Sequence, residues 1–420
     1  MSLPVISCAE ALDRIGSGRR IIASPGCGAP TTLLEAIGSD PDRIQGSHLF
    51  SGLLLGDYPF LDAVGEGTIG YGTWHVMPPV RRLVTDGTVD FYPVRGSQVP
   101  ALLRHLDVDV ALVRVAPPDR HGWCNLGPST SYPLTAIAAS KLVVAELDES
   151  VPRARGEAAI HVSRIDFAVE STSAMPEYRR AESDAMSKAI AKHIVGLLPD
   201  RPILQIGIGS ISEAFVDELL DARVGGLRFA GMGVDGIADL HDAGLLDVDG
   251  LHPYPPVLAA ELMGSRRLMD FAHENPSLGM FGTPIGINAQ TLGGLDRFVS
   301  VNSALEVDIH GQVSSEVVGG KQISGVGGSV DFVDAAMHSA GGCRVIAMAA
   351  TNVRDSSSKL VRSLAEGVPV TIPRHAVDCV VTEHGVARLA HASARERLEQ
   401  LAAVAAPAHR DELLGRSAVA

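Results

Sequence analysis

The segment VDVALVRVAP (108–117) is followed by SYPLTAIAAS (131–140), KLVVAEL (141–147) and RIDFAVE (164–170). The first, third and fourth of these are short, nearly continuous runs of Val, Leu, Ile and Ala, which is typical of strands buried on both faces. The second has the apolar spacing of a helix. Buried strands joined by helices predict a mainly parallel sheet with helices on both faces.

The same alternation continues on either side of this segment. Upstream lie RIIASPG (20–26), a helical TTLLEAI and VDFYPV (89–94). Downstream, a polar stretch (175–200) precedes a second series of strand-like runs. We therefore predict an α/β protein of two related domains, 1–190 and 191–420, each with a mainly parallel sheet. The runs of the second series are PILQIGIG (202–209), LRFAGMG (227–233), VLAAELMG (257–264), FVSVNSALEVDIHG (298–311), CRVIAMAAT (343–351), VPVTIP (368–373) and CVVTEHG (379–385), with a helix expected at ISEAFVDELLDA.

Composition excludes several classes of function. The 420 residues carry 49 acidic and 35 basic side chains, a net charge of −14, which argues against nucleic-acid binding. Five scattered Cys without a CxxC pair argue against a disulfide framework or a zinc site. Charged residues, Gly or Pro interrupt every apolar run before it could span a membrane. The start, MSLPVISCAEALDRIGSGRR, predicts an amphipathic helix, not a signal peptide, so we expect a cytoplasmic protein.

Three turns are rich in small residues: ASPGCGAP (23–30), QIGIGSISEAF (205–215) and KQISGVGGSVDFVDAA (321–336). Glycine lets a ligand approach the backbone, and a following helix N-terminus favours an anion, but tight turns also need glycine. None has the Rossmann or P-loop spacing, so neither NAD nor ATP is expected. Polar side chains follow other strands, at Asn302, Ser303, Glu306 and Asp308 and at Glu383 and His384. Glu306 and Asp308 share one strand face, a spacing that could equally bind the amides of a turn.

Four of these strings together resemble the acetyl-CoA hydrolase/transferase family of class I CoA-transferases, which includes 4-hydroxybutyrate and butyrate:acetate CoA-transferases. They are VNSALEVDIHGQVSSEVVGGKQISGVGGSVDFV (301–333), CVVTEHGVARL (379–389), APPDRHGWCNLG (116–127) and QIGIGSISEAF. The resemblance implies two related α/β domains, an acyl-CoA site in the cleft between them, and a homo-oligomer, often a dimer. It implies a coenzyme A thioester as substrate, a small-molecule acceptor, no tightly bound cofactor and no metal.

The resemblance also implies which residues contact the acyl-CoA and how the reaction runs. The matching positions for binding are Gly207, Gly209, Ser210, Met232, Asn302, Ser324, Gly325, Val326, Gly327 and Gly328. In the family a Glu carboxylate attacks the thioester and forms an acyl-glutamyl anhydride, then a glutamyl-CoA thioester. Backbone N–H groups of glycine-rich loops stabilise the oxyanion.

The sequence departs from the family at the nucleophile. The family block resembles G-x-x-T-E-M-x-x-D-G-x-x-D-L, and the matching stretch here is LRFAGMGVDGIADL (227–240). Gly231 then occupies the position of the Glu and Ala230 that of the Thr. Glu261, Asp235, Cys27 and Cys124 are candidates to replace the carboxylate, with Glu261 and Asp235 favoured.

We predict an acyl-CoA enzyme that transfers its acyl group to a non-CoA acceptor, or hydrolyses the thioester, without a glutamyl anhydride. Two alternatives remain open. One is a CoA-transferase with a relocated carboxylate; the other is a non-catalytic acyl-CoA-binding partner subunit.

Overall fold

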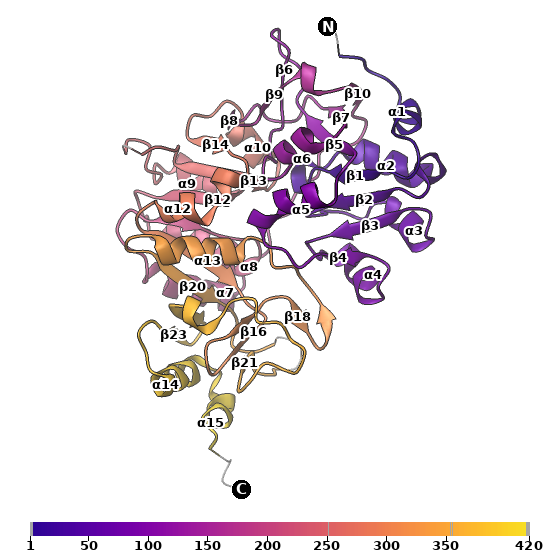
Figure 1. Ribbon diagram of the computed structural model, residues 1–420. Coiled ribbons are helices and arrows are strands. Elements are labelled where there is room, and N and C mark those ends of the chain that lie inside the picture. The colour runs from indigo at the N-terminus through magenta and orange to yellow at the C-terminus, as the bar shows by residue number, and fades with distance from the viewer. Residues whose placement is uncertain (1–2, 251, 353, 355, 417–420) are drawn as a thin grey trace. The chain divides into compact units, whose positions relative to one another are not determined.

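The computed structural model describes residues 3–250, 252–352, 354 and 356–416 (Figure 1). The chain divides into two compact units, each assembled from three separate segments. The first unit contains 1–179, 231–235 and 252–287, and the second contains 180–230, 236–251 and 288–420. Both are α/β with mainly parallel strands, as the sequence predicts. The single boundary at residue 190 stays a prediction.

The first unit is built on a seven-stranded sheet in the order β10-β7-β5-β1-β2-β3-β4. Every neighbouring pair is parallel. The strands are β1 (Arg20–Ala23), β2 (His48–Ser51), β3 (Gly70–Thr73), β4 (Asp90–Phe91), β5 (Val110–Val115), β7 (Leu142–Leu147) and β10 (Phe167–Glu170).

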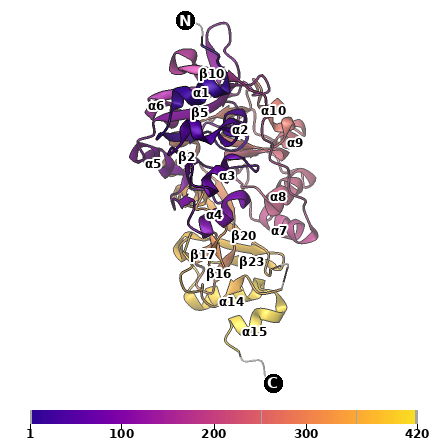
Figure 2. The same ribbon diagram turned by 90° about the vertical axis from the view of Figure 1, so that its right-hand side faces the viewer.

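Alternation along these strands divides their side chains between two apolar cores. Ile21 and Leu112 face one core, and Ile22 and Val113 face the other. Figure 2 shows α2 and α3 on one side of β2 and β5, and α5 and α6 on the other. The sheet is therefore covered on both faces, which explains its nearly continuous apolar strands. The helices are α1 (Cys8–Ile15), α2 (Thr31–Ser39), α3 (Phe60–Gly65), α4 (Arg81–Thr85), α5 (Val99–His105) and α6 (Pro133–Ala139).

A late part of the chain completes the first unit. The strands β13 (Val257–Met263), β14 (Leu278–Met280) and β8 (Arg155–Gly156) are parallel neighbours in that order. The helices α10 (Arg266–Ala272) and α11 (Thr283–Gly286) follow β13 and β14, and a short antiparallel pair joins β6 (Trp123–Asn125) to β9 (Ala159–His161). Residues 128–131 run alongside β13, because the Ala260 carbonyl accepts the Thr130 and Ser131 amides at 3.0 and 3.1 Å.

The second unit has strands in the order β23-β22-β20-β15-β11-β12, parallel except for the final β22–β23 hairpin. They are β11 (Ile203–Gln205), β12 (Arg228–Val234), β15 (Phe298–Ser303), β20 (Cys343–Ala347), β22 (Cys379–Thr382) and β23 (Gly385–Arg388). Residues 228–230 of β12 belong to this unit, and residues 231–234 belong to the first unit. Figures 1 and 2 together show α13 on one face of this sheet and α7 and α8 on the other.

The helices of this unit are α7 (Ala185–Val195), α8 (Ser210–Asp221), α9 (Gly236–Asp242), α12 (Ala289–Gly293), α13 (Ser329–His338), α14 (Ala394–Val404) and α15 (Arg410–Leu413). The run 298–311, predicted as one strand, is two, because β15 ends at Ser303 and β16 (Glu306–Asp308) joins a separate small sheet. That sheet contains β17 (Val313–Ser314) and β21 (Leu360–Val361), and β18 (Val317–Val318) pairs with β19 (Lys321–Gln322).

Candidate functional site

Strand β12 carries Gly231, the position that the family resemblance assigns to the nucleophile. Gly231 has a φ of +95°, which L side chains rarely adopt. Ala230 before it is buried, and Met232 after it is half-buried. The local backbone at this point is therefore shaped for glycine, which has no side chain that could act as a nucleophile.

Asp235 follows β12 directly, and its carboxylate is committed to the turn that begins α10. One oxygen, Oδ1, accepts the Ser265 backbone N–H and the Ser265 hydroxyl, both at 3.0 Å. The other oxygen accepts the same N–H at 3.2 Å. These bonds give Asp235 a structural role at the start of a helix and leave it poorly suited to attack a thioester.

Glu261 lies near the end of β13, and its side chain is buried with 7% of the residue exposed. The segment 128–131 brings two hydroxyl groups to one of its oxygens. Ser129 donates to Oε1 at 2.8 Å, and Ser131 donates to the same Oε1. The second oxygen, Oε2, has no hydrogen-bond partner among the residues that the structure describes.

The electrostatic state of Glu261 follows from this environment. Burial raises the pKa of Glu261 to about 8, and the hydrogen bonds from Ser131 and Ser129 oppose this effect without cancelling it. Near neutral pH the group can therefore both release and accept a proton, which is the property of a general acid–base residue.

The two candidate thiols are less suited to catalysis. Cys27 lies in the buried turn Gly26–Gly28, where its thiol donates to the Gly264 carbonyl at 3.7 Å. Burial raises the pKa of Cys27 to about 11, and burial does the same for Cys124 on β6. Both are protonated at neutral pH, whereas the thiolate is the nucleophilic form.

The glycine-rich turn after β1 supports the Glu261 site through packing. A Cβ at Gly28 would lie 2.6 Å from the Cβ of Ser129, and one at Gly26 would lie 3.0 Å from the sulfur of Met263. Real Cβ atoms essentially never show a contact as short as the one at Gly28, and the contact at Gly26 is tighter than most. Glycine in ASPGCGAP therefore permits the close approach of Ser129, which in turn holds Glu261.

The second unit contains the predicted acyl-CoA contacts that follow β11 and β15. Gly209 has a φ of +111° and precedes α8, and the Ser210 hydroxyl accepts a hydrogen bond from Ser187 at 3.1 Å. Asn302 at the end of β15 donates its amide to Gln205 of β11 at 3.1 Å. Gly207 lies between Gln205 and Gly209, so these residues gather at the carboxyl ends of neighbouring parallel strands.

The segment 324–328 connects β19 to α13 in the same unit. The Ser324 amide donates to the Glu316 carbonyl at 3.2 Å, and the Ser329 hydroxyl donates to the Val326 carbonyl at 2.9 Å. Gly327 has a φ of +61°. At Gly328 a Cβ would lie 2.6 Å from the ring of Phe332. The segment is thus held at Ser324 and at Val326, with Gly325 between them.

Three other acidic residues that the sequence analysis named are Asp308, Glu383 and Glu306, and the first two bind backbone amides. Asp308 accepts the backbone amides of His310 and Gln312, each at 2.9 Å, so it binds a turn as one alternative foresaw. Glu383 accepts the Ala350 amide at 2.9 Å. Burial raises the pKa of Glu306, and the charge of Lys359 opposes that shift.

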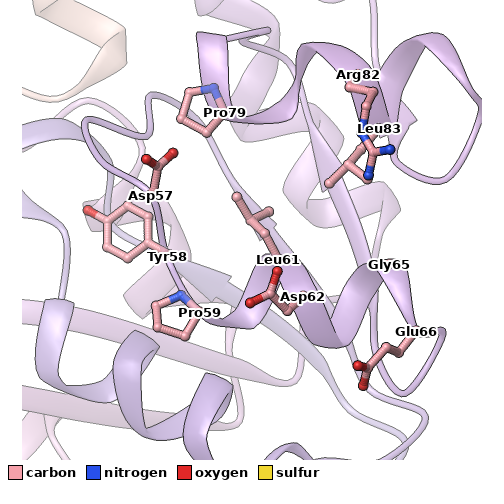
Figure 3. A pocket seen from close by; sticks show the side chains of 10 residues that line it. All are labelled: Asp57, Tyr58, Pro59, Leu61, Asp62, Gly65, Glu66, Pro79, Arg82 and Leu83. Atoms are coloured by element: carbon pink, nitrogen blue, oxygen red, sulfur yellow. The ribbon is translucent and has the colours of Figure 1, made fainter.

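A hollow of about 760 Å³ opens on the first unit between α3 and α4 (Figure 3). Its acidic and basic lining residues are three carboxylates, Asp57, Asp62 and Glu66, and one guanidinium, Arg82. An acidic lining disfavours the phosphates of coenzyme A. This hollow contains none of the predicted site residues.

Two further properties concern what the described residues can bind. None of their helices has the length and hydrophobicity needed to cross a bilayer. Nor do three or more His, Cys, Asp or Glu side chains gather in the described part of the chain so that they could hold a metal ion.

Sequence reasoning missed Ser129, Ser131 and His75. The two serines lie in GPSTSYP (127–133), a run of hydroxyl residues between a strand and a helix, which was the available signal. His75 follows β3, where burial lowers its pKa to about 4. Its Nδ1 has no partner among the described residues. A neutral imidazole nitrogen of this kind can accept a hydrogen bond, but nothing in the sequence around it indicates burial.

Comparison with known proteins places these features in a family. Residues 3–176 match the acetyl-CoA hydrolase/transferase N-terminal domain, and residues 264–417 match the corresponding C-terminal domain. The 4-hydroxybutyrate coenzyme A transferase of Clostridium kluyveri is 33% identical over 98% of this chain and 96% of its own length. The butyryl-CoA:acetate CoA-transferase of Anaerostipes caccae is 32% identical over 82% of this chain and 80% of its own.

Solved structures agree with the sequence relatives. The crystal structure of RipA from Yersinia pestis superposes with a TM-score of 0.91 at 26% identity, covering 99% of this chain and 97% of that one. The similarity to these proteins extends over nearly the whole chain, both in sequence and in structure. The chain belongs to the acetyl-CoA hydrolase/transferase family, whose members are acyl-CoA transferases and hydrolases.

Proposed function

We propose that this protein uses an acyl-CoA thioester and passes the acyl group to a non-CoA acceptor, or to water, without forming a glutamyl anhydride. The observation that carries the proposal is Gly231. It occupies the position where the family block has its Glu, and its φ of +95° suits glycine and not a longer side chain. A chain without a carboxylate at that position cannot form the anhydride there.

A mass-spectrometric assay tests this function directly. The protein is incubated with a panel of acyl-CoAs, each with and without acetate, and with water, alcohols and amines as acceptors. We expect free CoA together with an acid, ester or amide, and no new acyl-CoA when acetate is present. Exchange of CoA between two carboxylic acids would contradict the proposal.

A second candidate is a CoA-transferase that uses Glu261 in place of the missing Glu. One observation favours it: Glu261 is a buried carboxyl with an unoccupied oxygen, Oε2, in the described structure. This mechanism would form a glutamyl-CoA thioester, which borohydride reduces and hydroxylamine cleaves. Modification of Glu261 by either reagent after incubation with acyl-CoA would support this candidate over the first.

We also propose an oligomeric state, the acyl-CoA contacts and a cellular location. The family resemblance supports a homodimer, with no tightly bound cofactor. It also supports acyl-CoA binding through Gly207, Gly209, Ser210, Met232, Asn302 and residues 324–328. A cytoplasmic location fits the low cysteine content. Light scattering after size exclusion measures the oligomer, and absorbance with mass spectrometry of the purified protein detects a retained cofactor.

A further inference from the structure

We propose that Glu261 transfers the proton in this reaction, and that the acceptor is a protic nucleophile (water, an alcohol or an amine) and not a carboxylate. The inference rests on the proposed function and adds to it a catalytic residue and a class of acceptor. It begins from an asymmetry in how the two oxygens of this carboxyl group are bound.

The hydrogen bonds of Glu261 occupy one oxygen only. The hydroxyls of Ser129 and Ser131 converge on Oε1, while Oε2 has no partner among the described residues. Buried polar atoms in folded proteins are nearly always hydrogen-bonded, so an unpaired buried carboxyl oxygen needs an explanation. Two donors on one side fix the orientation of the carboxyl group and leave the other side for a proton that the substrate brings.

The backbone around Glu261 makes this arrangement rigid. The Ala260 carbonyl accepts the amides of Thr130 and Ser131, and the Leu262 amide donates to the Pro128 carbonyl at 2.8 Å. These bonds tie 128–131 to β13 on both sides of Glu261, so the two serines cannot move independently of it. A group that transfers a proton must be held in a fixed position, and a side chain on a strand, supported by hydrogen-bonded neighbours, meets this requirement.

Acid–base properties narrow the class of acceptor. Burial raises the pKa of Glu261 to about 8, close to the range in which a general base is most effective. A carboxylate acceptor is already ionised at neutral pH and has no proton to lose. A general base therefore has no proton to remove from such an acceptor. Water, an alcohol or an amine must lose a proton as it attacks, and this is the step that Glu261 can serve.

The proposed reaction balances as follows. The acceptor X–H attacks the thioester carbonyl carbon and forms a C–X bond, while its proton passes to Oε2 of ionised Glu261. The tetrahedral intermediate then collapses and the C–S bond breaks. The proton on Oε2 passes to the departing CoA thiolate, which leaves as the thiol. The products are acyl–X and CoA–SH, and Glu261 returns to its ionised form.

In this mechanism Ser129 and Ser131 are positioning residues. Their hydroxyls stabilise the ionised carboxylate through Oε1, so removing either one should raise the pKa of Glu261 further. That shift appears in the pH dependence of the rate. A purely structural role would not move the pH dependence.

The test compares wild type with Glu261→Gln, Glu261→Asp, Ser131→Ala and a matched control, Glu157→Gln. Glu157 is an exposed carboxylate of the same unit that accepts the Gly282 amide at 3.0 Å, a bond that Gln retains. The acyl-CoA and the acceptor are those that the panel identifies for wild type. CoA release is followed as a function of pH, and acyl-CoA affinity is measured by calorimetry.

We expect Glu261→Gln to lower kcat by about 100-fold or more. Acyl-CoA affinity should stay within about threefold of wild type, since the lost group acts on the reacting proton. Glu261→Asp should recover part of the rate, and Glu157→Gln should match wild type. The kcat/KM of wild type should rise with pH through a midpoint at about 8, and the midpoint should be higher in Ser131→Ala.

The possible failures are distinguishable. If wild type acylates a protic acceptor and Glu261→Gln keeps its kcat and pH profile, the role of Glu261 is wrong while the proposed function stands. If wild type exchanges CoA between carboxylic acids only, or consumes no acyl-CoA at all, both are wrong. An acyl group found on Ser129 or Ser131 by peptide mass spectrometry would also overturn the inference, since it assigns the serines no covalent step.

Discussion

At the scale of single residues, two positions carry the proposed chemistry: Gly231, where the family resemblance places a nucleophilic Glu, and Glu261, a buried carboxyl group. Gly231 offers no functional group and has a left-handed backbone. Glu261 carries the one carboxyl group of β13, a strand that is buried along its whole length. The assignment of Gly231 to the nucleophile position comes from the family resemblance, in which the surrounding Met, Asp and Gly match without a gap, and it stays a prediction. For the second, the sequence allowed only a candidate, because burial and partners depend on residues 130 positions away.

Replacing Gly231 tests whether its backbone conformation matters. Any residue with a Cβ is strained at a φ of +95°, so Gly231→Ala and Gly231→Glu should both lower the free energy of unfolding by about 1–3 kcal/mol. Denaturant titration measures this. Gly231→Glu alone should add weak CoA exchange between acyl-CoA and acetate, with Gly231→Ala as the control for strain. Undiminished native turnover in a folded Gly231→Glu protein would show that this position does not border the reacting centre.

The raised pKa of Glu261 also makes stability depend on pH. The folded-state value of about 8 lies above the ordinary value of 4.5, so the folded protein retains a proton that the unfolded chain releases. The stabilisation is fully present below pH 4.5 and is lost as pH rises through about 8. Glu261→Gln stays neutral and lacks this loss. Its stability relative to wild type should therefore increase between pH 5 and pH 9, measured by urea unfolding at each pH; a constant difference would contradict the raised pKa.

At the scale of elements, the long apolar strands were predictable and the short polar ones were not. VALVRV of β5 and LVVAEL of β7 are buried along nearly their whole length. Their nearly continuous Val, Leu and Ala residues indicate this burial in the sequence. HLFS of β2 and GYGT of β3 are four residues each and mix small and polar side chains, so neither produced a signal. VPVTIP reads as a strand, yet only Ile372 makes a bridge, to Val313. Periodicity cannot distinguish such a run from a packed loop.

The segment 324–328 offers a prediction at this scale, because its proposed role in CoA binding depends on backbone conformation. Gly327 has a φ of +61°, which Asn tolerates far better than Val. Gly327→Val should lower CoA affinity about tenfold or more, while Gly327→Asn should retain most of it. Calorimetry on folded protein, checked by circular dichroism, measures both. Equal affinity in all three proteins would remove this segment from the CoA site.

At the scale of the whole molecule, the sequence predicted two α/β domains but could not reveal how the chain is shared between the two compact units. The chain passes from one unit to the other after residues 179, 230, 235, 251 and 287. Strand β13, with Glu261, follows α9 of the second unit in sequence but belongs to the first unit. Local patterns identify strands and helices, whereas the choice of unit depends on contacts between distant segments.

This sharing of the chain leads to a prediction about fragments cut at the predicted boundary. A fragment of residues 1–190 lacks 252–287, and the amides of Thr130 and Ser131 then lose the Ala260 carbonyl that accepts them. The buried faces of Ser129 and Cys27 lose Glu261 and Gly264 as partners.

The fragment should therefore aggregate or unfold without a cooperative transition, as measured by thermal circular dichroism and size exclusion. Coexpressed 1–190 and 191–420 should restore a soluble complex, because together they supply all three segments of each unit. A monomeric 1–190 with a cooperative transition would mean that the first unit does not need β13. The Glu261 site would then be an addition to a domain that is already complete.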